Sequence, residues 1–202
     1  MLFGWNIHVL EELKNNRAEI IDILNKIESK ETANTEYDSA IDCLERAYLE
    51  KEFWGNNIPQ FAAFMPVNLP LNSLILGLMS SLAARETFIR PASDTRDIVT
   101  EISQLLRLEH YFPNFHIRLD DRQTFLDQYV KTADAVYFVG EFNNAKKIQK
   151  IAKANALFLY SGTGINPFIV TADADVSLSV WKSLLYTGTI LIVLYPILLT
   201  RA

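Results

Sequence analysis

Residues 159–175, LYSGTGINPFIVTADAD, contain two short apolar runs on either side of a small polar segment. The runs at 156–160 and 167–171 are bounded by glycine and proline, which is typical of buried strands. The polar segment at 161–164 lacks the Gly-Lys-Ser/Thr ending of a phosphate-binding loop. We therefore predict a turn between two strands at this point.

Apolar runs of the same kind recur from Phe61 onward, separated by helical patterns. The runs predict strands at 61–65, 87–89, 115–119, 135–140, 156–160, 167–171 and 190–199. The intervening periodicity predicts helices at 72–84, 94–110, 122–131, 142–153 and 174–186, the first three capped by Asn72, Ser93–Asp94 and Asp121. Strands alternating with helices of this length form βαβ crossovers. The predicted fold class is α/β, a Rossmann-like, mostly parallel sheet flanked by helices.

The N-terminal part of the chain is predicted to be helical. Apolar side chains recur every three or four residues across 5–28 and 34–53, as in amphipathic helices. The only cysteine, Cys43, lies four residues before Ala47 at this spacing, so we expect it to be a small buried core side chain. A single cysteine excludes an internal disulfide and any multi-cysteine metal site.

The composition excludes several classes of protein. The chain has 202 residues, of which 50% are hydrophobic, enough for one domain with an appendage. A net charge of −5 and the lack of a basic block argue against a nucleic-acid partner. His8, His110 and His116 are too scattered to predict a metal site. The apolar run 184–199 is shorter than the roughly twenty residues of a membrane span, so we expect a buried strand and a cytoplasmic protein.

Four motifs, in order, resemble the aldehyde dehydrogenase superfamily. MPVNLP at 65–70 is similar to that family's P-W-N-F-P turn, and TFIRPAS at 87–93 to its V-V-x-K-P-S-E strand end. AVYFVG at 135–140 is similar to the strand before F-T-G-S. The last motif, E-L-G-G-K-S-P-x-I-V-x-x-D-A-D, is matched at Gly164, Pro167, Ile169, Asp173, Ala174 and Asp175. The acyl-CoA reductases of bioluminescence systems share part of this pattern, and that branch stays open.

The catalytic positions implied by this resemblance carry different residues. Ser161 stands where the family has its general-base glutamate, and Leu191 stands where it has its nucleophilic cysteine. A serine hydroxyl does not act as a carboxylate base near neutral pH, and leucine has no thiolate. Asn68 matches the asparagine that donates a hydrogen bond to the developing oxyanion. We therefore predict that the chain has no catalytic residues of its own.

The cofactor positions implied by the resemblance are Arg90, Ser93, Gly140 and Glu141. Arg90 replaces the lysine that holds the adenosine ribose, and Gly140 lies in the turn that receives the diphosphate. Glu141 replaces a serine there, and a carboxylate repels phosphate by about 1 kcal/mol or more near a protein surface. We expect Glu141 to cap its own helix. No tightly held cofactor is therefore predicted, with NAD or NADP as the open alternative.

The resemblance also implies a division of the chain and a function. Residues 1–58 form an N-terminal helical region, 59–164 a nucleotide-binding-like α/β domain, and 165–202 a remnant of the catalytic domain. The expected protein is a truncated, degenerate aldehyde-dehydrogenase-like pseudoenzyme, a non-catalytic binding or assembly subunit. The alternative is an NAD(P)-binding oxidoreductase component that acts on aldehyde or acyl substrates with a partner chain. An uncovered Ile190–Leu199 would favour a homo-oligomer or a partner protein bound through this C-terminal strand.

Overall fold

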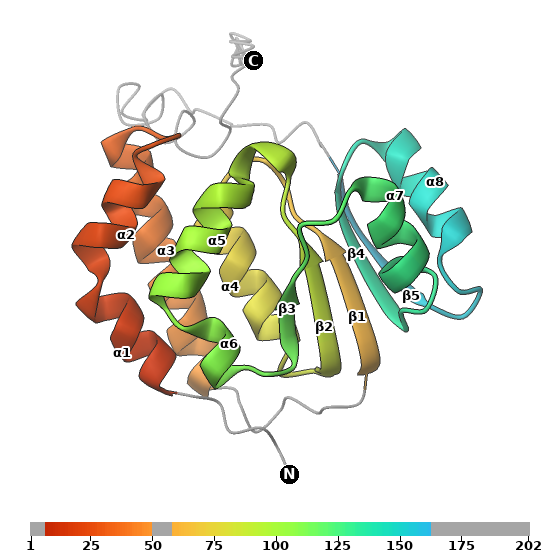
Figure 1. The fold of residues 1–202 in the computed structure, drawn as a ribbon, viewed down its shortest axis with the longest axis horizontal. Helices are drawn as coiled ribbons and strands as arrows, with labels where there is room; N and C mark the ends of the chain where they lie inside the picture. The colour runs from red at the N-terminus through yellow and green to blue at the C-terminus, as the bar shows by residue number, and fades with distance from the viewer. Residues whose placement is uncertain (1–6, 50–57, 163–202) are drawn as a thin grey trace, which may run out of the picture. The chain divides into compact units, whose positions relative to one another are not determined.

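The computed structural model describes residues 7–49 and 58–162, and its centre is a five-stranded sheet (Figure 1). The strands are β1 (Ile58–Phe64), β2 (Ala84–Arg90), β3 (Phe115–Ile117), β4 (Ala135–Gly140) and β5 (Leu157–Gly162). Their order is β3-β2-β1-β4-β5, and every neighbouring pair is parallel. The predicted α/β fold class with a parallel, Rossmann-like sheet is therefore confirmed.

The helices lie on both faces of this sheet. One face carries α4 (Pro70–Ser80), α5 (Arg96–Leu105) and α6 (Leu108–Tyr111), with the short η2 (Ser93–Thr95) before α5. The other face carries α7 (Arg122–Phe125), η3 (Leu126–Val130) and α8 (Phe142–Ile151). The chain moves outward from β1 to β3, returns to β4 and then moves the opposite way. Right-handed crossovers therefore place the two sets of helices on opposite faces.

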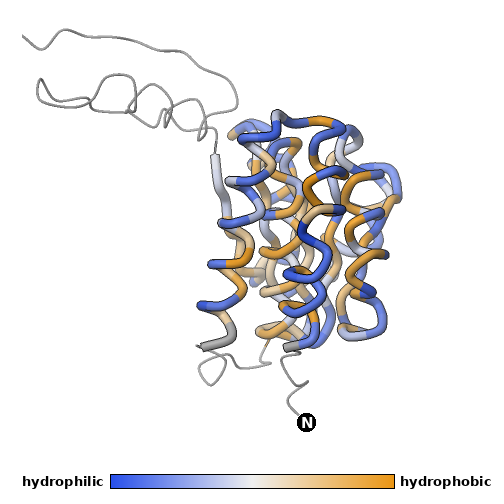
Figure 2. Tube along the Cα trace, turned by 90° about the vertical axis from the view of Figure 1, so that its left-hand side faces the viewer, coloured by the Kyte–Doolittle hydropathy of each residue, from blue (hydrophilic) through white to orange (hydrophobic). Residues whose placement is uncertain are grey.

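The N-terminal helices form an additional layer outside α4 and α5 (Figure 1). They are α1 (Ile7–Asn15), α2 (Arg17–Leu24) and α3 (Lys30–Leu49). Hydrophobic residues alternate with hydrophilic ones along the helical turns, as expected for amphipathic helices (Figure 2). The described residues all belong to one compact unit that spans residues 1–164. The division at residue 58 stays a prediction.

Two hydrophobic cores lie on the two faces of the sheet. The large core joins the N-terminal helices to α4, α5 and the β1–β3 strands; its fully buried members include Leu13, Ile20, Leu24, Leu44, Leu71, Leu74, Ile75, Leu78, Ile89 and Ile102. At its centre α4 approaches β2 closely, because a Cβ on Gly77 would lie 2.8 Å from Ile89 Cγ2. The small core consists of Ala62, Phe64, Phe125, Leu126, Val130, Ala133, Val136, Phe138, Ala145 and Ile148.

The predicted helix starts are partly confirmed. Asp121 is the N-cap of α7, and its Oδ1 accepts hydrogen bonds from the N–H groups of Gln123 and Thr124 at 2.8 and 3.0 Å. The prediction for Asn72 is wrong, because α4 already begins at Pro70 and its N-cap is Leu69. Pro70 suits the first turn because it has no N–H group that would need a partner. Ser93 begins η2, but no side chain caps η2 or α5.

Two further predictions differ from the structure. Cys43 is exposed, because the buried face of α3 is formed by Ala33, Tyr37, Ala40, Leu44 and Ala47 and Cys43 lies at its margin. The turn predicted at residue 161 is also displaced, since β5 continues through Gly162. Backbone pairing with β4 keeps Ser161 and Gly162 extended. The strands and helices predicted beyond residue 162 lie outside the described residues.

None of the helices within residues 7–49 and 58–162 is both long enough and apolar enough to cross a membrane.

Candidate functional site at the carboxyl edge of the sheet

The candidate site lies where the strand order reverses, between β1 and β4. In open parallel sheets ligands bind beyond the carboxyl ends of the strands at such a point, because the two flanking connections run to opposite faces and leave a crevice. The register aligns Phe64 of β1 with Arg90 of β2 and Phe138 of β4. Gly140 of β4 likewise pairs with Gly162 of β5. Four strand ends therefore meet at one edge.

Arg90 is the last residue of β2 and is half-buried at this edge. Its Nε donates a hydrogen bond of 2.9 Å to the carbonyl oxygen of Asp120, and Nη1 donates one of 3.4 Å to that of Pro91. These bonds fix the guanidinium against the β3–α7 connection. They leave part of its donor set for another acceptor, since a guanidinium has five N–H groups.

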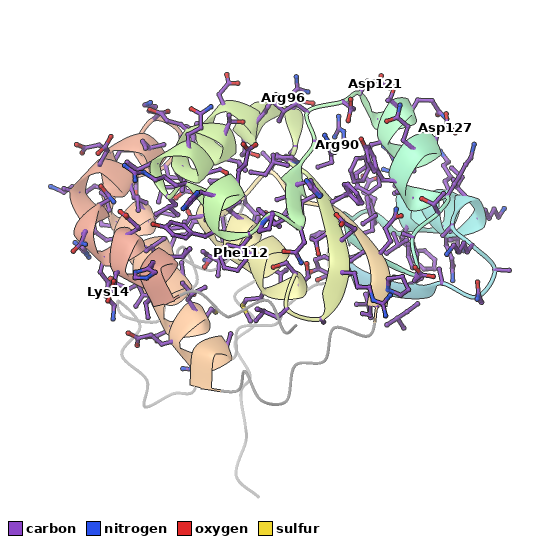
Figure 3. All side chains as sticks on the ribbon, turned by 60° about the horizontal axis from the view of Figure 1, so that its bottom comes forward. Lys14, Arg90, Arg96, Phe112, Asp121 and Asp127 are labelled. Carbon is purple, nitrogen blue, oxygen red and sulfur yellow. The ribbon has the colours of Figure 1, made fainter. Side chains whose placement is uncertain are left out.

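Two other arginines, Arg96 and Arg122, are close enough to act on the charge of Arg90, and we call the three the arginine cluster. Burial lowers the pKa of Arg90, and the positive charges of Arg96 and Arg122 lower it further, while Asp121 and Asp120 raise it. Arg90, Arg96 and Asp121 lie at the same edge in Figure 3. The carboxylate of Asp121 already accepts hydrogen bonds from Gln123 and Thr124. The arginine cluster is therefore a place where an anion gains charge-assisted hydrogen bonds.

The end of β4 forms the second part of the edge. Gly140 has a φ of 148°, and a Cβ there would lie 2.9 Å from the Phe138 ring, so a side chain at this position would be strained. Glu141 occupies the N-cap position of α8 and is exposed. Its side chain makes no capping hydrogen bond, so the expected capping role is not observed. The first N–H groups of α8 are therefore not occupied by this carboxylate, although its charge remains beside them.

The candidate catalytic residues lie at the same edge. Ser161 is exposed on β5 and pairs with Val139 of β4, one residue before Gly140. Tyr160, its neighbour, donates a 3.0 Å hydrogen bond from its hydroxyl to the carbonyl oxygen of Gly140. Asn68 is exposed in the loop between β1 and α4. Leu191 lies outside the described residues.

The fold brings the candidate residues to one edge but not to one point. Ser161 and Glu141 are near each other because β4 and β5 are adjacent. Arg90 and Ser93, at the end of β2, lie two strands from Glu141 and three strands from Ser161, about 10 and 14 Å at the usual spacing between strands. A ligand that contacts both parts of the edge must span this distance, as a dinucleotide does.

Sequence reasoning missed two glutamates below the Asn68 loop, Glu36, which is buried, and Glu28, which is half-buried. Glu36 is 2% exposed on α3, and its Oε1 accepts the N–H of Asn72 at 2.9 Å. The sequence does indicate that Glu36 is buried, because it lies three residues after Ala33 and four before Ala40, within an apolar helical face. A carboxylate at such a position needs a specific partner.

His8 and His110 both lie beside Tyr111, with ring centroids 6.1 and 5.0 Å from that of the tyrosine. His8 and His110 are exposed, and His116 Nε2 lies 2.7 Å from Glu86 Oε2. No group of three or more His, Cys, Asp or Glu side chains within the described ranges could hold a metal ion.

Solved structures share this arrangement of strands and helices. A glyceraldehyde-3-phosphate dehydrogenase from Methanocaldococcus jannaschii, solved with NADP, superposes on 86% of the chain with a TM-score of 0.71 and 18% identity. An NAD-dependent benzaldehyde dehydrogenase from Corynebacterium glutamicum superposes on 86%, with a TM-score of 0.70 and 19% identity. An NADP-dependent enzyme of E. coli reaches 0.73 over 88% of the chain, with 16% identity. The chain has the aldehyde dehydrogenase fold.

The chain spans less than half the length of these aldehyde dehydrogenase structures. It covers 43% of the M. jannaschii enzyme, 44% of the C. glutamicum enzyme and 42% of the E. coli enzyme. No family profile and no curated protein matches the sequence. At 16–20% identity the likeness establishes the fold, whereas the activity must be argued from the residues.

Proposed function

We propose that the chain is an aldehyde-dehydrogenase-like binding module that does not itself carry out the covalent step. The observation that supports this proposal is the carboxyl edge, which retains anion-binding features but has a serine, Ser161, at the position of the general base. A hydroxyl group cannot replace a carboxylate that activates water near neutral pH. The carboxyl edge is therefore better suited to binding an anionic ligand than to catalysing its conversion.

The position of the only cysteine also supports this proposal. Cys43 lies on α3, seven residues beyond Glu36 toward the C-terminus of that helix. Seven residues of α-helix correspond to about 10 Å. Because Glu36 contacts the start of α4, this distance carries Cys43 away from the carboxyl ends of the strands. Its thiol is therefore not the nucleophile of an aldehyde dehydrogenase site at that edge.

A second candidate is an NAD(P)-binding oxidoreductase component that acts on aldehyde or acyl substrates with a partner chain. The arginine cluster favours it, because Arg90, Arg96 and Arg122 would hold the 2′-phosphate of NADP by charge-assisted hydrogen bonds. Gly140 and the first N–H groups of α8 would then hold the diphosphate. The nicotinamide ring would accept a hydride, and this chain would bind and orient the cofactor.

The experiment that separates the two candidates is calorimetric titration with NADP and NAD, combined with an assay of aldehyde oxidation. The first proposal predicts no turnover and no saturable binding with either dinucleotide. Turnover that disappears in a Cys43→Ala variant would overturn it. The second candidate predicts saturable NADP binding that is weakened about tenfold or more in Arg90→Gln, for a loss of about 1.4 kcal/mol.

The matched control for Arg90→Gln is Arg85→Gln. Arg85 is exposed near the amino end of the same strand, so its loss removes the same charge far from the carboxyl edge. Equal weakening of NADP binding by both substitutions would show a general effect of charge and would remove the arginine cluster as the binding site.

A further inference from the structure

Two glutamates meet below the loop that joins β1 to α4. Glu36 is buried on α3, and Glu28 is half-buried in the connection between α2 and α3. Their carboxyl groups are close enough for each to shift the pKa of the other. The Oε2 atoms of both are buried and receive no hydrogen from any described N–H or O–H group. Two ionised carboxylates are acceptors only, so a hydrogen bond between them needs one proton.

The two carboxyl groups hold the beginning of α4 in place. Glu36 Oε1 accepts a 2.9 Å hydrogen bond from the N–H of Asn72. The backbone of Leu71 acts on Glu36, and that of Leu69 acts on Glu28, to oppose the rise in the pKa of each carboxyl group. No local side chain caps this helix. Leu69 has a φ of 55° and a ψ of 63°, a left-handed conformation that is strained for leucine. The glutamates thus supply the partners that the first turn of α4 lacks and hold Leu69 in its strained conformation.

The positive charges nearest to the pair in the sequence, Lys26 and Lys30, are exposed, and Lys26 is paired with Glu101. The segment 65–80, which forms the loop and α4, contains no ionisable side chain. The other charged groups on the helices packed against α3 lie at or near the surface: His8, Glu11, Glu12, Lys14, Arg17, Glu19 and Asp22. Lys14 is paired with Glu45 and Arg17 with Asp38. On α5, Glu101 is paired with Lys26. Glu28 is therefore the charged group that acts most directly on Glu36.

Burial and the second carboxylate make ionisation of Glu36 unfavourable. Burial raises the pKa of Glu36 to about 8, the N–H of Asn72 opposes this rise, and the charge of Glu28 adds to it. Burial also raises the pKa of Glu28. Because the two groups interact, they titrate as a pair.

We propose that Glu28 and Glu36 share one proton and act as a pH-operated latch that holds the loop 66–69 and the start of α4 against the helical layer. Loss of the proton places two negative charges in a buried space and separates the carboxyl groups. Leu69 then loses its partner and relaxes, and the loop that carries Asn68 is released. The latch depends only on this geometry. A negative result for the latch would therefore not contradict the proposed function, and the reverse also holds.

The direction of the pH effect follows from linkage. The pKa of Glu36 is higher in the folded protein than its ordinary value of 4.5. Its contribution to stability is therefore fully present below pH 4.5, declines as pH rises and is lost as pH passes through about 8. Acid strengthens the latch and mild alkali opens it.

The test compares the wild-type protein with a Glu36→Gln variant across about pH 6 to 9. A glutamine keeps an acceptor for Asn72 and donates its own N–H to Glu28, so it keeps the latch closed at every pH. We expect the melting temperature of the wild type to fall across this range and that of Glu36→Gln to stay nearly flat. In an NMR titration, the Asn72 amide should shift with a midpoint near 8 in the wild type and not in the variant.

The control is Glu31→Gln, which removes a carboxylate from the exposed first turn of α3 and should leave the wild-type profile unchanged. A second variant, Glu28→Gln, keeps the proposal testable if Glu36→Gln does not fold. Removing the neighbouring charge should lower the midpoint of the Asn72 titration. A wild-type Asn72 amide that does not titrate between about pH 6 and 9, or an unchanged midpoint in Glu28→Gln, would overturn the latch.

Discussion

The two halves of the sheet are covered very differently. The β1–β3 half packs against α4 and α5 and, beyond them, the three N-terminal helices, and these layers enclose the large core. The β4–β5 half is covered on one face by α7, η3 and α8 over the small core. On β5, Leu157, Leu159 and Tyr160 are 55%, 42% and 39% exposed. The first half therefore accounts for most of the stability, and the second half offers surface.

The largest expected effect is in the large core. Leu74 on α4 is fully buried, so Leu74→Ala should reduce the free energy of unfolding by about 3–5 kcal/mol through lost burial and a residual cavity. Leu76 on the same helix is 44% exposed, and Leu76→Ala should change the free energy of unfolding by less than about 0.5 kcal/mol. Urea denaturation followed by circular dichroism measures both. Similar losses from the two variants would show that α4 is not packed as described.

The small core should tolerate the corresponding change better. Ile148 is one of two buried residues on α8, the other being Ala145. Ile148→Ala should cost about 2 kcal/mol, the lower end of the usual range, because the thin layer around it can relax. Hydrogen exchange should show the loss of protection first in α8 and β5. The control is Phe142→Ala on the same helix, where the side chain is 56% exposed. A loss as large as that of Leu74→Ala would remove the difference between the halves.

The contrast extends to the carboxyl edge, where Glu141 begins α8 in the thinner half. If a dinucleotide binds, Glu141→Ser should tighten binding about tenfold, or about 1.4 kcal/mol, because it removes a charge beside the diphosphate. Calorimetry with NADP measures the change, and Glu109→Ser, an exposed carboxylate on α6, controls for net charge. Unchanged or weaker binding in Glu141→Ser would show that Glu141 is not the obstacle.

The sequence predicted the alternation of strands and helices because each β-strand contains a short apolar run. It missed the start of β2, where Arg85 and Glu86 interrupt the apolar pattern and the predicted helix 72–84 extends into the strand. It predicted the positions of Arg90 and Gly140 because both end such runs. The prediction that Cys43 is buried was wrong, because helical spacing alone does not distinguish the centre of a buried helix face from its margin. The partner of Glu36 could not be found from local patterns, because Asn72 is thirty-six residues away and the contact depends on how α3 and α4 pack.

The smallest expected effect on stability is at the exposed edge of β5. The side chain of Leu159 is already 42% exposed, so replacing it with lysine removes little buried apolar surface. Leu159→Lys should therefore change the free energy of unfolding by less than about 0.5 kcal/mol. Its effect on association should be larger, because a lysine on an edge strand opposes pairing with another strand. The homo-oligomer or partner complex expected from the sequence involves Ile190–Leu199, which lies outside the described residues, whereas β5 is an edge strand of the described sheet. Size-exclusion chromatography with light scattering should therefore show a smaller species for Leu159→Lys, whereas Gln149→Lys on exposed α8 should leave the size unchanged. A wild-type monomer with the same elution as both variants would show that β5 is not an interface.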